Sequence, residues 1–146
     1  MKVALDISNI LFIKLCYIGY AEHDTFFCFT NLMSEIRDNF CKTLDKAESG
    51  IGGNMQRLNQ LLKQKDKELW ARLEQQTMDP QFYSFRWLTL LLTQEFELPD
   101  VLRLWDSFFA DPERFEFLIY FCCAMLLYLS LLALFSFTYS HLQLPS

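Results

Sequence analysis

The sequence predicts an all-α fold of four or five helices, and three observations support this prediction. Of its 146 residues, 52 % are hydrophobic and 16 % aromatic, whereas only 4 are Gly and 4 are Pro. This large apolar supply with few turn residues favours long helices over a β-sandwich or barrel. Apolar residues also recur at three- and four-residue steps, and proline punctuates the chain where helices would begin. The length suits one domain with a core.

The first predicted helix covers residues 24–44, with Asp24 or Thr25 as its N-cap. Residues 45–54 follow as an exposed loop, because three glycines stand there. The helix should bury one apolar stripe, made of Phe26, Phe29, Met33, Ile36, Phe40 and Leu44.

Four further segments complete the helical prediction. A helix over 55–77 ends before Asp79-Pro80, since the residue before proline disfavours the α region. A helix over 81–95 is apolar on every side and should therefore be buried. The fourth carries Pro99 in its first turn and reaches about Phe109. The fifth begins at Asp111-Pro112-Glu113, with Asp111 as N-cap.

Charge and cysteine usage exclude several classes of protein. The net charge is −5 and no basic block occurs, which argues against nucleic-acid binding. The five cysteines are odd in number and form no Cys-x-x-Cys, and the two histidines, His23 and His141, lie far apart in the sequence. We therefore expect free thiols packed as small apolar groups in a reducing compartment, with no metal site and no cofactor.

Two apolar segments raise the question of a membrane. Residues 117–139 form a run of 23 without a charge, long enough either for a transmembrane helix or for a core helix with a hydrophobic tail. Residues 1–20 contain a shorter apolar patch interrupted by Lys14. We interpret that patch as a signal-peptide mimic rather than a targeting signal.

One block identifies a family. Residues 84–106 read SFRWLTLLLTQEFELPDVLRLWD, which resembles the signature of the TBC domain of Rab GTPase-activating proteins. Residues 24–40 and 114–126 are similar to other helices of that domain, in the same order. The resemblance implies the C-terminal half of a TBC domain over 21–129, between a divergent segment 1–20 and a divergent hydrophobic tail 130–146. The family-motif residues, expected to be structural, are Arg86, Trp87, Glu95, Phe96, Asp100, Leu104, Trp105 and Asp106.

The family activates Rab GTPases with two residues supplied in trans, and neither motif occurs here. An arginine in Ile-x-x-Asp-x-x-Arg neutralises charge on the transferred phosphoryl group, and a glutamine in Tyr-x-Gln orients the attacking water. Asp-x-x-Arg occurs at Asp100–Arg103 and at Asp111–Arg114, but the residue three before the aspartate is Glu97 or Phe108 rather than an isoleucine, and no Tyr-x-Gln is present. We expect no catalytic residue in this chain, which is a member of a GTPase-activator family rather than an enzyme.

Arg86 lies between Phe85 and Trp87, so it is either a finger or a buried structural arginine. We predict the buried role, because an apolar helix offers the guanidinium no exit toward a partner. Its acidic partner should be Glu95, Asp100 or Asp106. Trp87 and Trp105 are expected to anchor adjacent helices in the core, with direct contact to a Rab as the alternative.

The resulting hypothesis is a Rab-directed TBC protein in the cytoplasm, peripheral to membranes. Beyond about Leu127 the family pattern continues as a charged helix, so the uncharged run joins a core helix to a foreign tail. Membrane insertion of 117–139 as a tail anchor is thereby disfavoured but stays an alternative. A non-catalytic helical module that binds a Rab or a scaffold is the other.

Overall fold

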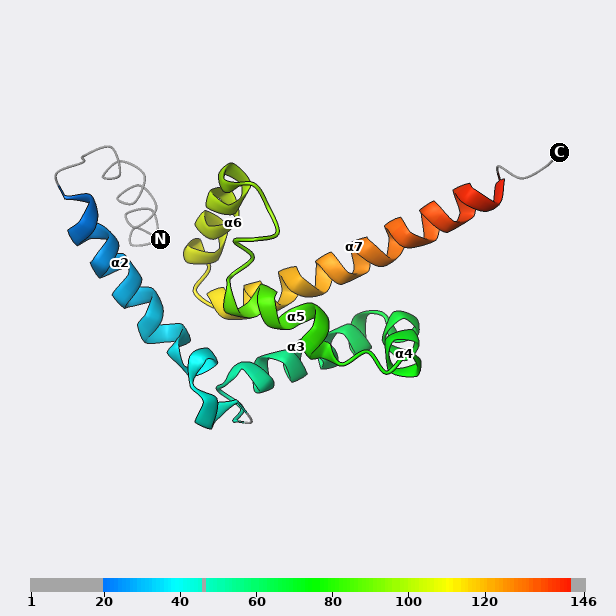
Figure 1. Ribbon diagram of the computed structural model, residues 1–146, viewed down its shortest axis with the longest axis horizontal. Coiled ribbons are helices and arrows are strands. Elements are labelled where there is room, and N and C mark those ends of the chain that lie inside the picture. The colour runs from blue at the N-terminus through cyan, green and yellow to red at the C-terminus, as the bar shows by residue number, and fades with distance from the viewer. Residues whose placement is uncertain (1–19, 46, 143–146) are drawn as a thin grey trace.

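The computed structural model describes the backbone of residues 20–45 and 47–142 and the side chains up to Ala133. This part of the chain is helical and contains no strand (Figure 1), which confirms the all-α prediction. Segment 1–20 lies outside it except for Tyr20, as do residues 143–146 of the tail. The α-helices are α2 Ala21–Ile36, α3 Ile51–Lys65, α4 Lys67–Gln75, α5 Pro80–Thr89, α6 Leu98–Ala110 and α7 Arg114–Leu142, with two 3₁₀ turns at Arg37–Phe40 and Lys42–Leu44.

The core lies where α3, α5 and α7 pack together. Helix α3 contacts α4, α5 and α7, and α6 packs on α7. The most deeply buried side chains are leucines of α3 and of the segment that follows α5, together with a thiol of α7: Leu58, Leu62, Leu92 and Cys122 are all 0 % exposed. The middle of the chain thus forms a small helical body.

Two helices extend from this body at opposite ends of its long axis (Figure 1). Helix α2 is attached by its C-terminal end, where Ile36 is buried and Glu35 forms an ion pair with Arg114 at 3.4 Å. Helix α7 is attached by its N-terminal part and runs outward toward the C-terminus. Both helices therefore present surface that the body leaves uncovered.

The first helix departs from its predicted bounds and cap. It begins at Ala21, after Tyr20 and without a side-chain cap, so the prediction of Asp24 or Thr25 as N-cap is wrong. It ends at Ile36, and 3₁₀ turns replace the rest of the predicted 24–44 helix. The apolar stripe is only half used, because Phe26 and Phe29 are 64 % and 59 % exposed. The spacing of apolar residues predicted which side of the helix is apolar, but it could not predict whether other helices cover that side.

The predicted glycine loop and the predicted 55–77 helix both change. Helix α3 already begins at Ile51, so Gly53 lies in its first turn. A Cβ on Gly53 would lie 2.2 Å from a carbonyl oxygen of the preceding loop, so glycine permits this close approach. The helix then breaks at Asp66, whose extended backbone separates α3 from α4 and whose carboxylate accepts from the Leu69 amide at 2.9 Å. The cap at Asp66 thus divides into α3 and α4 the segment that apolar spacing predicted as one helix.

The last three helices agree more closely with the predictions. Helix α6 has Pro99 in its first turn, as predicted. Helix α7 starts at Arg114, because the Asp111 carboxylate accepts from the Glu113 amide in a turn instead of capping the helix. Helix α5 is shorter than the predicted 81–95, since it ends at Thr89. The reason for that end lies in the candidate site.

Candidate functional site

The family-motif residues gather at the junction between α5 and α6. Helix α5 stops because Leu91 and Leu92 adopt left-handed backbone conformations, with φ of 48° and 63°. Such angles cost about 1–2 kcal/mol for a residue with a Cβ, so surrounding contacts must hold them. Both leucines are buried, at 5 % and 0 % exposed. The turn from 90 to 96 is therefore fixed by tertiary packing.

Trp105 is one of the contacts that hold this turn. Its indole Nε1 donates to the Leu91 carbonyl oxygen at 2.9 Å, across 14 residues of sequence. Its ring meets the Phe109 ring edge-on, with 5.8 Å between the centroids. Trp87, on α5, is buried in the core at 7 % exposed. Trp105 thus ties α6 to the turn that follows α5, and Trp87 lies in the core.

Arg86 and Glu95 form the second contact across the turn. The pair is two-pronged: Nη2 donates to Glu95 Oε2 at 3.0 Å, whereas Nε lies 2.7 Å from Oε1 in an ionic contact without a hydrogen bond. The pairing with Glu95 is confirmed, but the prediction that Arg86 is buried is wrong: its side chain is 59 % exposed, whereas that of Glu95 is 14 % exposed. Helix α5 buries Trp87 and Leu88 on one side and leaves Arg86 on the other.

The remaining motif residues fall into two groups. Leu104 packs against the core, and Phe96 meets Phe121 of α7 edge-on at 6.2 Å between centroids. Asp100 and Asp106 are exposed on α6, and Glu95 rather than either of them is the ion-pair partner of Arg86. The junction therefore brings six of the eight residues into the packed interface and leaves the two aspartates outside it.

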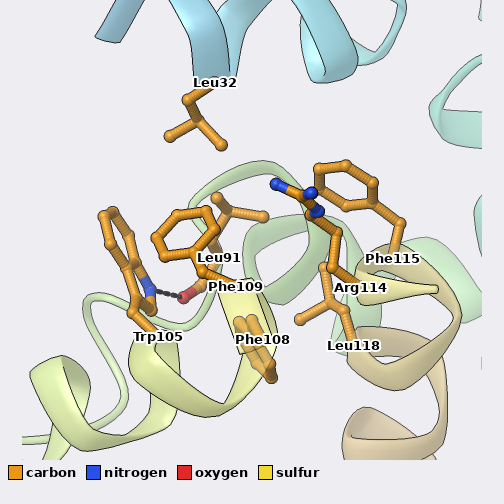
Figure 2. A pocket seen from close by; sticks show the side chains of 8 residues that line it. All are labelled: Leu32, Leu91, Trp105, Phe108, Phe109, Arg114, Phe115 and Leu118. Atoms are coloured by element: carbon orange, nitrogen blue, oxygen red, sulfur yellow. Dashed lines mark hydrogen bonds between the residues drawn. The ribbon is translucent and has the colours of Figure 1, made fainter. Parts of the chain in front are cut away.

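A small apolar pocket lies beside the junction, between α2, α6 and α7 (Figure 2). Figure 2 shows Leu32 of α2 on one side of it, with Trp105 bonded to Leu91 on the other. Its volume of about 10 Å³ is that of a single water molecule. Arg114 is the charged residue of its wall. The pocket marks where α2 meets the body and offers no room for a substrate.

The buried thiols of Cys122 and Cys123 pack in the core and are not nucleophiles. Burial, reinforced by the neighbouring Cys123, raises the pKa of the Cys122 thiol from 9.0 to about 12. Such a thiol stays protonated at neutral pH and is a poor nucleophile. The prediction of packed free thiols is confirmed for Cys122 and Cys123 but wrong for Cys41, which is free and exposed.

Sequence reasoning missed several contacts that shape the junction. The left-handed leucines carry no sequence signal, because glycine or asparagine usually marks such positions. The ion pair between Glu35 and Arg114 links residues far apart in the chain, so only the fold reveals it. Both contacts depend on helix order rather than on local pattern.

Comparison with known proteins identifies the class of this helical frame. The Rab-GTPase-TBC domain family matches residues 5–133, a range that reaches into both flanking segments. The chain therefore belongs to the Rab-GTPase-TBC domain family.

Among its relatives, TBC1 domain family member 13 of Mus musculus and that of Homo sapiens are each 61 % identical over 108 residues. Those residues are 74 % of this chain and 27 % of the relative, so the match spans about a quarter of member 13. GTPase-activating protein GYP1 of Saccharomyces cerevisiae is 32 % identical over 93 residues, which are 64 % of this chain and 14 % of GYP1. No solved structure matches the chain.

Proposed function

We propose that this chain is part of a TBC-type Rab GTPase-activating protein and acts on Rab GTPases in membrane traffic. Family membership is the observation that supports this function, together with a relative whose name is GTPase-activating protein. The helical TBC architecture fits a cytoplasmic location. The partner we expect is a Rab in its GTP-bound state.

We further propose that the chain by itself does not accelerate GTP hydrolysis. Stimulation requires a guanidinium at the transferred phosphoryl group and an amide that orients the water. The sequence contains neither Ile-x-x-Asp-x-x-Arg nor Tyr-x-Gln. Arg86 cannot replace the finger readily, because it would have to leave the nearly buried carboxylate of Glu95.

The motif residues would then have a structural role in presenting the TBC surface. Arg86 and Trp105 act on the same turn from opposite sides of the junction. The boundaries that we propose are a TBC part over 21–129, flanked by 1–20 and 130–146. The blocks that resemble the family all lie between residues 24 and 126.

A Rab or scaffold-binding module without catalysis is the second candidate. One observation favours it: helix α2 exposes three phenylalanines, Phe26, Phe27 and Phe29, by 59–64 % each. Exposed aromatics of this kind are typical of protein contacts. Pull-down with GTP-loaded and GDP-loaded Rabs tests it, and a Phe27→Ser variant should weaken any capture that depends on α2.

The decisive experiment is a GTP-hydrolysis assay with a panel of Rabs. Full-length TBC1 domain family member 13 serves as the comparison protein, and circular dichroism checks that the chain is helical. We expect rates close to the intrinsic rate of each Rab. An increase of about a hundredfold or more by the chain alone would contradict the absence of finger chemistry. Capture of a Rab without stimulation would favour the second candidate.

A further inference from the structure

Helix α7 consists of two parts with different surroundings. From Leu118 to Leu126 its inward side belongs to the core: Leu118, Ile119, Cys122, Cys123 and Leu126 are at most 9 % exposed. Toward its C-terminal end the helix leaves the body (Figure 1). Tyr128, Leu129, Leu131 and Leu132 are 46–62 % exposed. We call the part from Tyr128 to Leu142 the α7 extension.

The α7 extension is apolar in a way that suits lipid better than a protein groove. No charged residue follows Glu116 in the sequence, so the extension has no charged face that would have to stay in water. A helix that docks in a groove keeps one polar face, whereas a helix without one needs an apolar medium all round. The Ser130 hydroxyl donates to the Leu127 carbonyl oxygen at 2.8 Å, so its polar group is satisfied inside the helix. Tyr128 stands at the base, where an amphipathic ring suits the headgroup region.

A group of lysines lies beside the base of the α7 extension. Lys63, Lys65 and Lys67 are exposed at the corner between α3 and α4. Helix α3 packs along α7, with Arg57 paired with Glu116 near the start of α7. Gln64, near the end of α3, lines the same hollow as Tyr120, so the corner lies farther along α7 toward the extension. Lysines in this position would face anionic headgroups when the extension enters a membrane.

Acidic residues between these lysines are already engaged. The Asp66 carboxylate caps α4 by accepting from the Leu69 amide, and Glu68 pairs with Arg72. Lys63 lies over the Trp70 ring, 4.1 Å from its centroid. The positive charge of the corner is therefore only partly offset by its own acids.

The length of the α7 extension limits how far it can insert into a bilayer. At about 1.5 Å per residue the extension is about 21 Å long, short of the hydrocarbon core of about 30 Å. The apolar window from Arg114 to Ala133 is long enough to span, but 28 % of it is buried in the body. A full span of about 20 residues ending at Leu142 would therefore include Cys123 and Leu126 and pull them out of the core.

We propose that the α7 extension inserts into one leaflet of a membrane with anionic lipid and holds this TBC segment at the membrane surface. The first part of α7 stays packed against α3 and α5 in this state. The inference goes beyond the proposed action on Rabs and does not depend on it, since it requires no contact with a GTPase. A second copy of the chain is the competing occupant of the extension.

Vesicle flotation of the whole chain tests the proposal. The vesicles consist of phosphatidylcholine alone or of phosphatidylcholine mixed with phosphatidylserine. The variant Leu131→Glu/Leu132→Glu changes two exposed side chains and leaves the core untouched. The control Phe82→Glu/Leu98→Glu adds the same charge at positions 77 % and 68 % exposed elsewhere. Circular dichroism of all three proteins confirms equal helix content.

We expect the chain and the control to float, more strongly with phosphatidylserine, and the extension variant to lose about tenfold or more of the bound fraction. Lys65→Glu/Lys67→Glu should remove only the gain from phosphatidylserine. Failure of the chain to float overturns the proposal, as does an extension variant that floats like the unchanged chain. Resistance to alkaline carbonate would indicate a full span and overturns it too. A dimer that the extension variant dissociates, without flotation, assigns the surface to a second copy instead.

Discussion

Replacing Arg86 should destabilise the chain more than replacing its partner Glu95. The two side chains form one ion pair but differ in exposure, at 59 % for Arg86 and 14 % for Glu95. Arg86→Ala leaves a nearly buried carboxylate without its cation. Glu95→Ala leaves an arginine that water already reaches. Because Glu95 is more buried than Arg86, losing Arg86 should lower the free energy of unfolding more than losing Glu95.

The magnitude follows from two limits. A pair in water contributes about 0–1 kcal/mol, and breaking a fully buried pair costs about 3–5 kcal/mol. With one partner exposed, we expect about 1–3 kcal/mol for Arg86→Ala and about 0.5–1 kcal/mol for Glu95→Ala. Arg86→Lys keeps the charge but loses the two-pronged geometry, so its cost should lie between zero and that of Arg86→Ala.

Pulse proteolysis in urea measures these free energies of unfolding with dilute protein. The double variant closes the cycle and gives the coupling between the two side chains. Arg103→Ala is the matched control, because Arg103 is exposed on α6 and the described part of the chain gives it no ion pair. It should change stability by less than about 0.5 kcal/mol. A cost for Glu95→Ala equal to or above that for Arg86→Ala would refute the reasoning.

Four further predictions concern the junction, two thiols and the start of α3. Trp105→Phe should cost about 1–3 kcal/mol, since the Leu91 carbonyl loses its donor, and urea unfolding measures it. Stability should fall as pH rises from 9.0 toward 12, because the raised pKa of Cys122 lets the unfolded thiol ionise first; Cys122→Ala should flatten this decline. Alkylation at neutral pH should modify Cys41 in the folded chain and Cys122 only after unfolding, as mass spectrometry would show. Gly53→Ala should destabilise the chain rather than gain helix propensity, because its Cβ would lie 2.2 Å from a carbonyl oxygen; a raised thermal midpoint would contradict this.

The sequence predicted a helix end correctly where a single residue type determines it. Pro99 lies in the first turn of α6 as its fixed φ requires, and the helix ends close to the predicted Phe109. The apolar segment 81–95 was predicted to be buried, and Trp87, Leu88, Leu91 and Leu92 of that segment lie in the core. An acidic partner was predicted for Arg86 among Glu95, Asp100 and Asp106, and the structure shows that it is Glu95.

Tertiary contacts decided what the sequence could not. Helix α5 ends at Thr89 because Leu91 is held by Trp105, which comes 14 residues later. Asp66 could have lain on the wet face of a single long helix, and its extended backbone divides α3 from α4 instead. Arg86 is exposed because only one side of α5 meets α3 and α7. The errors at α5 and Arg86 come from neighbours distant in sequence, whereas the break at Asp66 comes from a local cap to Leu69.

Helix α2 and the α7 extension both expose apolar surface, but their compositions suit different partners. Helix α2 carries the exposed Glu22 beside its exposed phenylalanines, so part of its surface must stay in water. A protein partner can cover the rest of such a helix, since a groove buries one face. The α7 extension has no charged residue to keep in water, so a groove would leave apolar surface exposed. These helices lie at opposite ends of the body (Figure 1), and one chain could therefore meet a protein through α2 while lipid covers the α7 extension.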